Sequence, residues 1–335
     1  MINLTTPLQK KIRWGAAGCG KFTETTFIPT IAILRRTKLI ALFSNDIKRA
    51  KSLAAKYSIP KYFSSYQEFL NSEIDAVYVG SANAHHFEQV ILAAKAGKHV
   101  LCDKPISITS QQAEEMVEVC NANNVQFAVN YPYRFHPLIQ KAKEIIDNQL
   151  LGKISVINTN FNINLFPSEN FRYNKNLSGG GALRDLGTHL IDLLRYLGGD
   201  ISEISGVMEN IIFKTDVEDF ASGIAKFSKS GYGTFTVSYA SPKSSNRIEV
   251  IGNKGSIIID NLIGQKFPSS AKMTISVEGK MTNSFRKRAN KFYRLLRSVN
   301  KSFLKNESPF VTGLDGLINM KLMEEFESKC LSKKN

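Results

Sequence analysis

Strand and helix signals alternate along residues 11–130, and this alternation constrains the fold more than any other feature of the chain. The expected strands are short apolar segments at 11–17, 38–44, 74–79, 99–102 and 125–130. The segments between them have helical spacing, with helices expected at 21–35, 50–57, 66–70, 86–96 and 109–121. Such alternation is typical of a doubly wound parallel sheet. We therefore predict an α/β domain over residues 1–130.

The pattern changes after residue 131, where longer strands are joined by short turns. Strands are expected at 154–163, 204–212, 221–227, 232–239, 247–252 and 255–259, and helices at 138–148 and 185–197. The turns at 229–231 and 253–255 contain glycine and are typical of β-hairpins. Residues 131–335 are therefore predicted to form a second, α+β domain with a large, mostly antiparallel sheet.

Length and composition limit the classes of protein to which this chain can belong. With 335 residues, 43% of them hydrophobic, it is long enough for two cores. No apolar run reaches the roughly 18 residues that a membrane span needs, and no signal peptide is visible. The four cysteines are scattered, without a C-x-x-C pair. We predict a cytoplasmic protein with free thiols, no metal site and no stable membrane insertion.

A basic segment near the C-terminus contributes much of the net charge of +15. Residues 284–305 contain eight basic side chains and no acidic one, and their apolar residues recur at helical spacing. We predict a surface helix with a solvated basic face. The alternatives are that the segment binds an anionic small molecule or an anionic membrane surface. A nucleic-acid partner is not expected.

A glycine-rich turn follows the first expected strand and precedes the first expected helix. In this position a glycine turn lets backbone N–H groups approach a pyrophosphate at the helix N-terminus. The third glycine of the dinucleotide fingerprint is replaced by Thr23. The residues of this turn that are predicted to bind a dinucleotide cofactor are Gly18, Cys19, Gly20, Lys21 and Phe22.

The end of the second expected strand indicates which dinucleotide binds. Ser44 is at the strand tip, Asn45 follows it, and Arg49 lies one helical turn further on. Serine and arginine can hold a 2′-phosphate, whereas an acidic residue at the tip would bind the ribose 2′-hydroxyl of NAD. Asp46 takes that acidic position if the register slips by two residues. We predict NADP(H) in preference to NAD(H), which stays possible.

Polar side chains also follow the next strand of the predicted parallel sheet. In open α/β folds, ligands bind at the carboxyl ends of the strands. Ser81, Asn83 and His86 come after the strand at 74–79 and are predicted on the cofactor side. Asn83 could instead cap the helix that follows.

The strand at 99–102 ends on a charged pair and a proline. Pro105 cannot continue a central strand, because it has no N–H group for the ladder. Asp103 and Lys104 therefore lie at the carboxyl end of the strand, beside the ligand crevice. Both are predicted to contact the cofactor, and Lys104 is also a candidate catalytic residue.

Asp185 and His189 lie four residues apart, after the three glycines at 179–181. On an α-helix, side chains at i and i+4 share a face. The carboxylate could therefore orient the imidazole for general acid–base catalysis. An aspartate favoured by the helix dipole beside a merely packed histidine is an equally good interpretation of the residues alone.

Five motifs together give the chain a family resemblance. They are GCGKF at 18–22, AKAGKHVLCDKP at 94–105, RFHP at 134–137, GGGALRDLGTH at 179–189 and GNKGS at 252–256. The chain resembles the glucose–fructose oxidoreductase, inositol dehydrogenase and MocA family of NAD(P)-dependent sugar and polyol oxidoreductases. The resemblance implies an N-terminal Rossmann domain and a C-terminal domain whose open sheet face mediates homodimer or homotetramer contacts. Asp103 departs from the family's usual glutamate.

The resemblance also implies roles for individual residues. Lys104 would hydrogen-bond the reacting oxygen, and His189, held by Asp185, would exchange its proton. Arg172 resembles the family's basic residue before the glycines, and Arg134 and Asn160 are further candidates for substrate binding. The expected reaction is hydride transfer between nicotinamide and a sugar, a polyol or a nucleotide-linked sugar. The alternative is a non-catalytic subunit that senses a dinucleotide.

Overall fold

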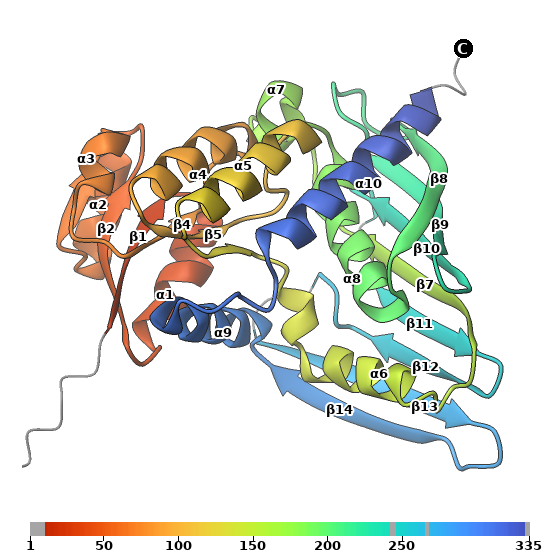
Figure 1. The fold of residues 1–335 in the computed structure, drawn as a ribbon. Coiled ribbons are helices and arrows are strands. Elements are labelled where there is room, and N and C mark those ends of the chain that lie inside the picture. The colour runs from red at the N-terminus through yellow and green to blue at the C-terminus, as the bar shows by residue number, and fades with distance from the viewer. Residues whose placement is uncertain (1–10, 242–245, 265–267, 332–335) are drawn as a thin grey trace, which may run out of the picture.

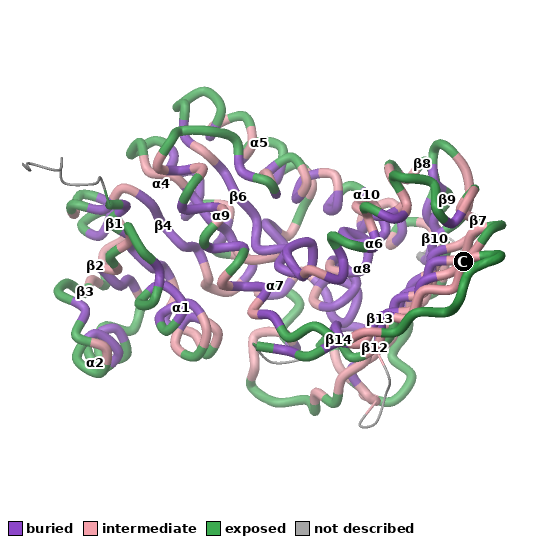
Figure 2. The backbone as a smooth tube through the Cα atoms, turned by 90° about the horizontal axis from the view of Figure 1, so that it is seen from below, coloured by how far each residue is buried: buried purple, intermediate pink, exposed green. Residues whose placement is uncertain are grey.

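The computed structural model describes residues 11–241, 246–264 and 268–331, and its first sheet confirms the predicted doubly wound architecture (Figure 1). Six parallel strands pair in the order β3-β2-β1-β4-β5-β6. They are β1 (Ile12–Ala17), β2 (Thr37–Phe43), β3 (Lys61–Phe63), β4 (Ala76–Val79), β5 (His99–Cys102) and β6 (Phe127–Val129). The connecting helices are α1 (Ile28–Ala32), α2 (Ile47–Tyr57), α3 (Tyr66–Leu70), α4 (His86–Lys95) and α5 (Ser110–Ala122). Helices α4 and α5 lie on one side of this sheet and α1 and α2 on the other (Figure 2).

The second sheet has eight strands in the order β14-β13-β12-β11-β7-β10-β9-β8, and only the β7–β10 pairing is parallel. Its strands are β7 (Ile154–Asn162), β8 (Ile201–Glu209), β9 (Phe220–Phe227), β10 (Tyr232–Ser238), β11 (Arg247–Gly252), β12 (Gly255–Asp260), β13 (Ser269–Val277) and β14 (Asn283–Ala289). Helices α6 (Pro137–Asp147), α8 (Thr188–Gly198) and α10 (Gly313–Leu331) lie along one face (Figures 1 and 2). The predicted antiparallel α+β sheet is confirmed, and its other face is not covered by a helix of the described residues.

The basic segment at 284–305 differs from the prediction of a single surface helix. Its first part is the edge strand β14, and only its second part, α9 (Lys291–Lys305), is helical. The cations at 286–288 follow one another along an exposed edge strand, which is a common way to discourage pairing with another chain. The strands β3 and β13 and the helix α10 were not predicted, and β8 lies three residues before its expected position.

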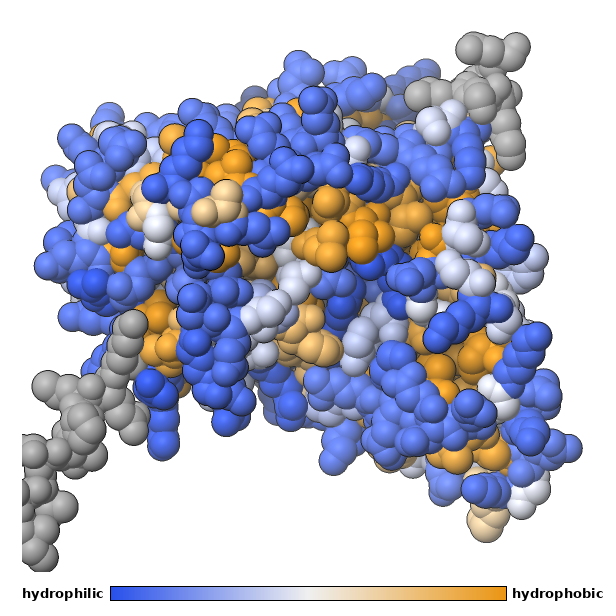
Figure 3. All heavy atoms as spheres, viewed as in Figure 1, coloured by the Kyte–Doolittle hydropathy of each residue, from blue (hydrophilic) through white to orange (hydrophobic). Residues whose placement is uncertain are grey.

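The two C-terminal helices pack against the N-terminal domain and hold the two sheets together. In α9, Phe303 stacks on Trp14 of β1 with the ring centroids 5.5 Å apart, and the Trp14 indole N–H donates to Asn300. In α10, Lys321 pairs with Glu114 of α5. Apolar side chains gather along α10 in Figure 3, and Leu314 at its start is 53% exposed. None of the helices in the described ranges is long and apolar enough to cross a membrane.

Candidate active site

The glycine turn after β1 is built for close backbone approach. Gly18 has φ +96°, and a Cβ atom there would lie 2.6 Å from the Ser81 nitrogen. The next helical turn, η1 (Thr23–Phe27), is a π-helix, and the Thr23 hydroxyl donates to the Gly18 carbonyl. Thr23 thus fixes the turn from the position where the fingerprint has its third glycine. The Cys19 side chain is buried, with its thiol 3.7 Å from the Phe43 carbonyl, and burial raises its pKa to about 11.

The prediction of the cofactor depends on which residue lies at the carboxyl end of β2. The strand ends at Phe43, so Ser44 is the first residue beyond it. The Asp46 carboxylate caps α2 by accepting from the Lys48 and Arg49 backbone N–H groups, so it already serves as a helix cap. Asn45 and Arg49 are exposed beside this tip. Both cap bonds use Oδ1 of Asp46, and the choice between NADP(H) and NAD(H) stays a prediction.

The loop after β4 uses its polar side chains to join other segments. Asn83 donates to the Ser178 carbonyl, which belongs to the other domain, at 2.8 Å. Ser81 donates to the Gln89 side chain. The buried His86 ring lies between two carbonyls, with Nδ1 2.9 Å from Pro105 and Nε2 3.2 Å from Ser81. A neutral imidazole can donate to only one of these carbonyls, so His86 holds this loop while its contact with a cofactor stays a prediction.

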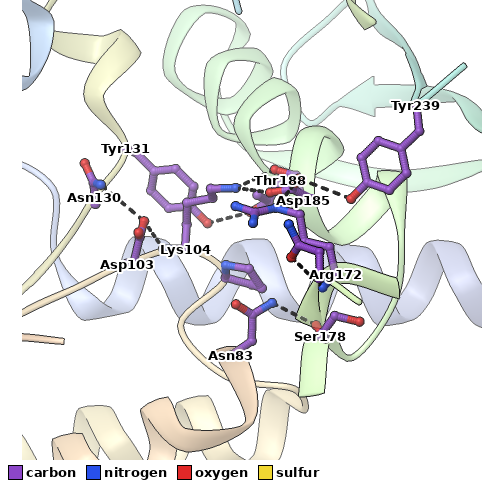
Figure 4. Close-up of polar contacts among 12 residues, drawn as sticks. Asn83, Asp103, Lys104, Asn130, Tyr131, Arg172, Ser178, Asp185, Thr188 and Tyr239 are labelled. Carbon is purple, nitrogen blue, oxygen red and sulfur yellow. Dashed lines mark hydrogen bonds and ion pairs between the residues drawn. The ribbon is translucent and has the colours of Figure 1, made fainter. Parts of the chain in front are cut away.

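An ion-pair cluster lies where the two domains meet (Figure 4). The Lys104 ammonium donates to the backbone carbonyl and to Oδ1 of Asp185, at 2.6 and 2.7 Å. Oδ2 of Asp185 accepts from Arg172 Nε at 2.9 Å and from the Tyr239 hydroxyl at 3.1 Å. The structure therefore brings three predicted residues together. Tyr239, directly after β10, was missed, because a tyrosine at the end of a strand carries no catalytic signal by itself.

Asp103, the residue before Lys104, is held by hydrogen bonds to both of its carboxylate oxygens. Its Oδ1 accepts from the Lys104 backbone N–H and from the Asn130 amide, and its Oδ2 accepts from the Tyr78 hydroxyl. These bonds fix the residue that precedes Lys104 at the strand end. The aspartate found here in place of glutamate still has partners on both oxygens.

A cavity of about 350 Å³ connects the glycine turn to this cluster. Its walls come from both domains, and they include every predicted cofactor-side residue except those of the β2 tip, Gly18 and Cys19. The N-terminal domain contributes Gly20, Lys21, Phe22, Thr25, Gly80, Ser81, Asn83, His86, Asp103 and Lys104. The C-terminal domain contributes Phe171, Arg172, Ser178, Gly180 and Asp185. An elongated ligand in this cavity would contact the glycine turn and Lys104 together.

His189 lies apart from the Asp185 carboxylate. It packs edge-on against Tyr133, with the ring centroids 5.1 Å apart, and lies 6.1 Å from the rings of Tyr131 and Phe161. Its Nδ1 is buried without a hydrogen-bond partner among the described residues. Among the described residues, the expected hydrogen bond between Asp185 and His189 is therefore absent, although the two groups still interact through their charges.

The physical reason lies in the backbone. Residues Leu183–Gly187 form a π-helical turn, η5, which has i→i+5 hydrogen bonds and more residues per turn than an α-helix. The i, i+4 rule therefore does not align Asp185 with His189. Asp185 faces Lys104 and Arg172 instead.

The charges of the cluster set the protonation states of its members. Burial alone would raise the pKa of Asp185, but Arg172 and Lys104 hold it well below its usual range, so the carboxylate stays ionised. Burial, together with the positive charge of Lys104, lowers the pKa of His189 well below its ordinary value. The imidazole is therefore neutral near pH 7 and can accept a proton.

Two predicted substrate residues lie elsewhere. Arg134 is buried, and its guanidinium forms ion pairs with Asp192 and Asp315 inside the protein. Asn160 accepts from the Arg247 backbone N–H and lies on the uncovered face of the large sheet, because successive β7 side chains alternate between faces. Its neighbour Phe161 is the residue that faces His189. Neither Arg134 nor Asn160 is among the residues that line the cavity, and their contact with a substrate stays a prediction.

Comparisons with known proteins agree with this geometry. The family model described as "Oxidoreductase family, NAD-binding Rossmann fold" matches residues 12–131, and "GFO/IDH/MocA C-terminal domain" matches residues 139–258. The chain is 30% identical over 249 residues to trans-1,2-dihydrobenzene-1,2-diol dehydrogenase from Bos taurus, covering 73% of this chain and 72% of that protein. It is 27% identical over 311 residues to 1,5-anhydro-D-fructose reductase from Ensifer adhaerens, covering 91% and 92%.

Solved structures share the fold over almost the whole length. Aldose-aldose oxidoreductase from Caulobacter crescentus superimposes with a TM-score of 0.89 at 24% identity, covering 97% of this chain and 98% of that one. A 3-ketoreductase from Actinomadura kijaniata, in complex with NADP, superimposes with a TM-score of 0.85 at 22% identity, covering 96% and 98%. The fold and site thus define a two-domain, nicotinamide-dependent oxidoreductase. The chain belongs to the Gfo/Idh/MocA family.

The glycine turn offers a test with a matched control. Gly18→Ala should abolish measurable cofactor binding and lower the melting temperature, because the new Cβ meets backbone atoms of Gly80 and Ser81. Gly97→Ala also places a side chain at positive φ, but nothing lies within 4 Å of it. It should lower the stability by only about 1–2 kcal/mol, the cost of an L-residue in the left-handed conformation, and leave cofactor affinity unchanged. Thermal shift with and without NADPH measures both effects, and equal behaviour of the two variants would contradict the close approach.

Proposed function

We propose that this protein transfers a hydride between NADP(H) and a hydroxyl-bearing or carbonyl carbon of a sugar, a polyol or a nucleotide-linked sugar. The observation that carries the proposal is a cavity that joins the glycine turn to the Lys104–Asp185–Arg172 cluster. The named relatives, a diol dehydrogenase and a sugar-derivative reductase, support a polar carbon bearing oxygen as the reacting centre. A non-catalytic dinucleotide sensor is the second candidate, but it would not require an ionised carboxylate that positions a lysine.

The residues present fit a dinucleotide. Gly18 lets the turn pack directly on the Gly80–Ser81 backbone, and the turn leads into a helical segment whose backbone N–H groups would meet a pyrophosphate. Ser44 and Arg49 would hold the 2′-phosphate at the tip of β2. When bound, the nicotinamide supplies the hydride or accepts it.

The protein's own groups would handle the proton and the charge. An ammonium has three donors, and Lys104 uses two of them on Asp185, which leaves one for the oxygen of the substrate. This hydrogen bond would stabilise negative charge as it develops on that oxygen. The neutral His189 would take the hydroxyl proton in the oxidative direction and return it in the reductive one.

Lys104→Met and His189→Asn test this assignment. Each should lower kcat by about 10²–10⁴ while leaving the dissociation constant for NADPH nearly unchanged. Lys301→Met removes an exposed cation of α9 and is the control that should retain full activity. Steady-state kinetics on a panel of sugars, polyols and nucleotide sugars, with circular dichroism to verify folding, makes the measurement. Near-normal kcat in either variant would remove that residue from the mechanism.

Cofactor choice is tested by fluorescence titration with NADPH and NADH. We expect tighter binding of NADPH, and Ser44→Asp should weaken it selectively by placing a negative charge beside the 2′-phosphate. Ser202→Asp, at an exposed position of β8, adds the same charge far from the cavity and should change neither affinity. Equal affinities of the wild-type protein for the two cofactors, or tighter NADH binding, would overturn the NADP(H) preference.

We also propose that the protein acts in the cytoplasm as a homodimer or homotetramer. The four cysteines are free and buried, which supports a reducing compartment. The uncovered face of the large sheet carries a polar patch over β7, β10 and β11, including Thr236 and Glu249. Light scattering after gel filtration should give a multiple of 37.4 kDa. Thr236→Arg should lower that mass, whereas a monomeric wild-type protein would refute the assembly.

A further inference from the structure

A buried lysine lies directly behind the aromatic residues that surround His189. Lys291, the first residue of α9, is 1% exposed. Its ammonium donates to the Ser269 hydroxyl at 3.3 Å and lies 5.1 Å from the centroid of the Tyr133 ring. The same ring packs edge-on against His189 at 5.1 Å. The lysine, the tyrosine and the histidine therefore form one continuous contact.

The position of Lys291 is unfavourable for stability. Burying an ammonium is costly even when it is hydrogen-bonded, and the first turn of a helix is the end where a positive charge is least favoured. The exposed cations of α9, such as Lys301, carry no such cost. The buried ammonium is therefore placed beside the Tyr133 ring at a cost that the exposed lysines of α9 do not have.

Building on the proposed function of His189, we propose that Lys291 is a positioning residue for it. The ammonium holds the Tyr133 ring, whose hydroxyl is fixed by the Gly264 N–H, and so fixes the surface against which the imidazole packs. Its positive charge also opposes protonation of His189, which keeps the imidazole in the form that can accept a proton.

Other charged groups near His189 also affect its protonation. The charges of the site act on His189 in opposite directions, since the ionised Asp185 favours the imidazolium and Lys104 disfavours it. Lys291 adds to the effect of Lys104, and its charge also acts on His136 together with that of Arg294. Burial, with these two cations, lowers the pKa of His136 to about 4, so His136 contributes no charge near neutrality.

The sign of the effect follows from the two titrations. Burial lowers the pKa of Lys291 to about 7, so the lysine gains its charge as the pH falls through that value. That new charge then raises the free energy of a second protonation at His189. The neutral imidazole therefore persists to lower pH than it would without the lysine.

The experiment is an NMR titration of the cofactor-free protein labelled with ¹⁵N-histidine. The chain has five histidines, and His189→Asn identifies the signal of interest. In Lys291→Met the midpoint of the His189 titration should rise by about 0.5–1.5 pH units. This is the effect expected when a positive charge separated from the imidazole by one aromatic ring is removed, in an effective dielectric near 20. Lys291→Arg, which keeps the charge, should show a midpoint no higher than wild type, and Lys301→Met should match wild type.

A kinetic readout accompanies the titration. The acid limb of the kcat/KM profile should move to higher pH in Lys291→Met, whereas a purely structural role would lower activity at all pH values without moving the limb. If Lys291→Met fails to fold, Lys291→Gln serves in its place. An unchanged His189 midpoint in the folded charge-free variant overturns the inference. Because the titration needs no turnover, its result is independent of whether His189→Asn abolishes activity, which tests the proposed function itself.

Discussion

The contact between Lys104 and Asp185 is the interaction on which the site depends, because it joins the two domains through charged groups that are largely buried. Their side chains are 12% and 16% exposed, so each charge requires a partner. Asp185 meets this requirement with Lys104 on one oxygen and with Arg172 and Tyr239 on the other. Among the residues that the structure describes, Asp185 is the one carboxylate between the two cations of this cluster, so its removal would leave Lys104 and Arg172 without their shared partner.

Such a contact requires the two sheets to be held at a fixed distance, and the C-terminal helices do this. Helix α9 stacks Phe303 on Trp14 of the parallel sheet. Helix α10 lies between α5 and β8, and its Glu327 pairs through both oxygens with the buried Arg184, one residue before Asp185. The end of the chain thus supports the very turn that carries the carboxylate. Arg134, expected at the substrate, belongs to this scaffold through Asp192 and Asp315.

Sequence reasoning predicted what depends on local chemistry. The glycine turn, the strand ending at Cys102 and the register that places Ser44 at the tip of β2 are set by a few adjacent residues, and the structure agrees with them. The face to which Asn160 points depends on the β7 register, which no local signal fixes. Helix α10 was missed because it is covered by α5, α8 and β8 together and so lacks a single apolar stripe.

The π-helical turns explain why the assignment of Asp185 could not follow from spacing alone. One turn, η1, follows the glycine motif, and the other, η5, contains Asp185, so both ends of the cavity have a locally widened helix. Such turns are often found at functional sites, and they shift side chains away from the α-helical faces that sequence spacing assumes. In η5 this shift lets Asp185 form its ion pair with Lys104, while His189 packs among aromatic rings. In the described part of the chain no hydrogen bond joins the carboxylate and the imidazole, and the pKa of each is held below its ordinary value, so the first stays charged while the second stays neutral.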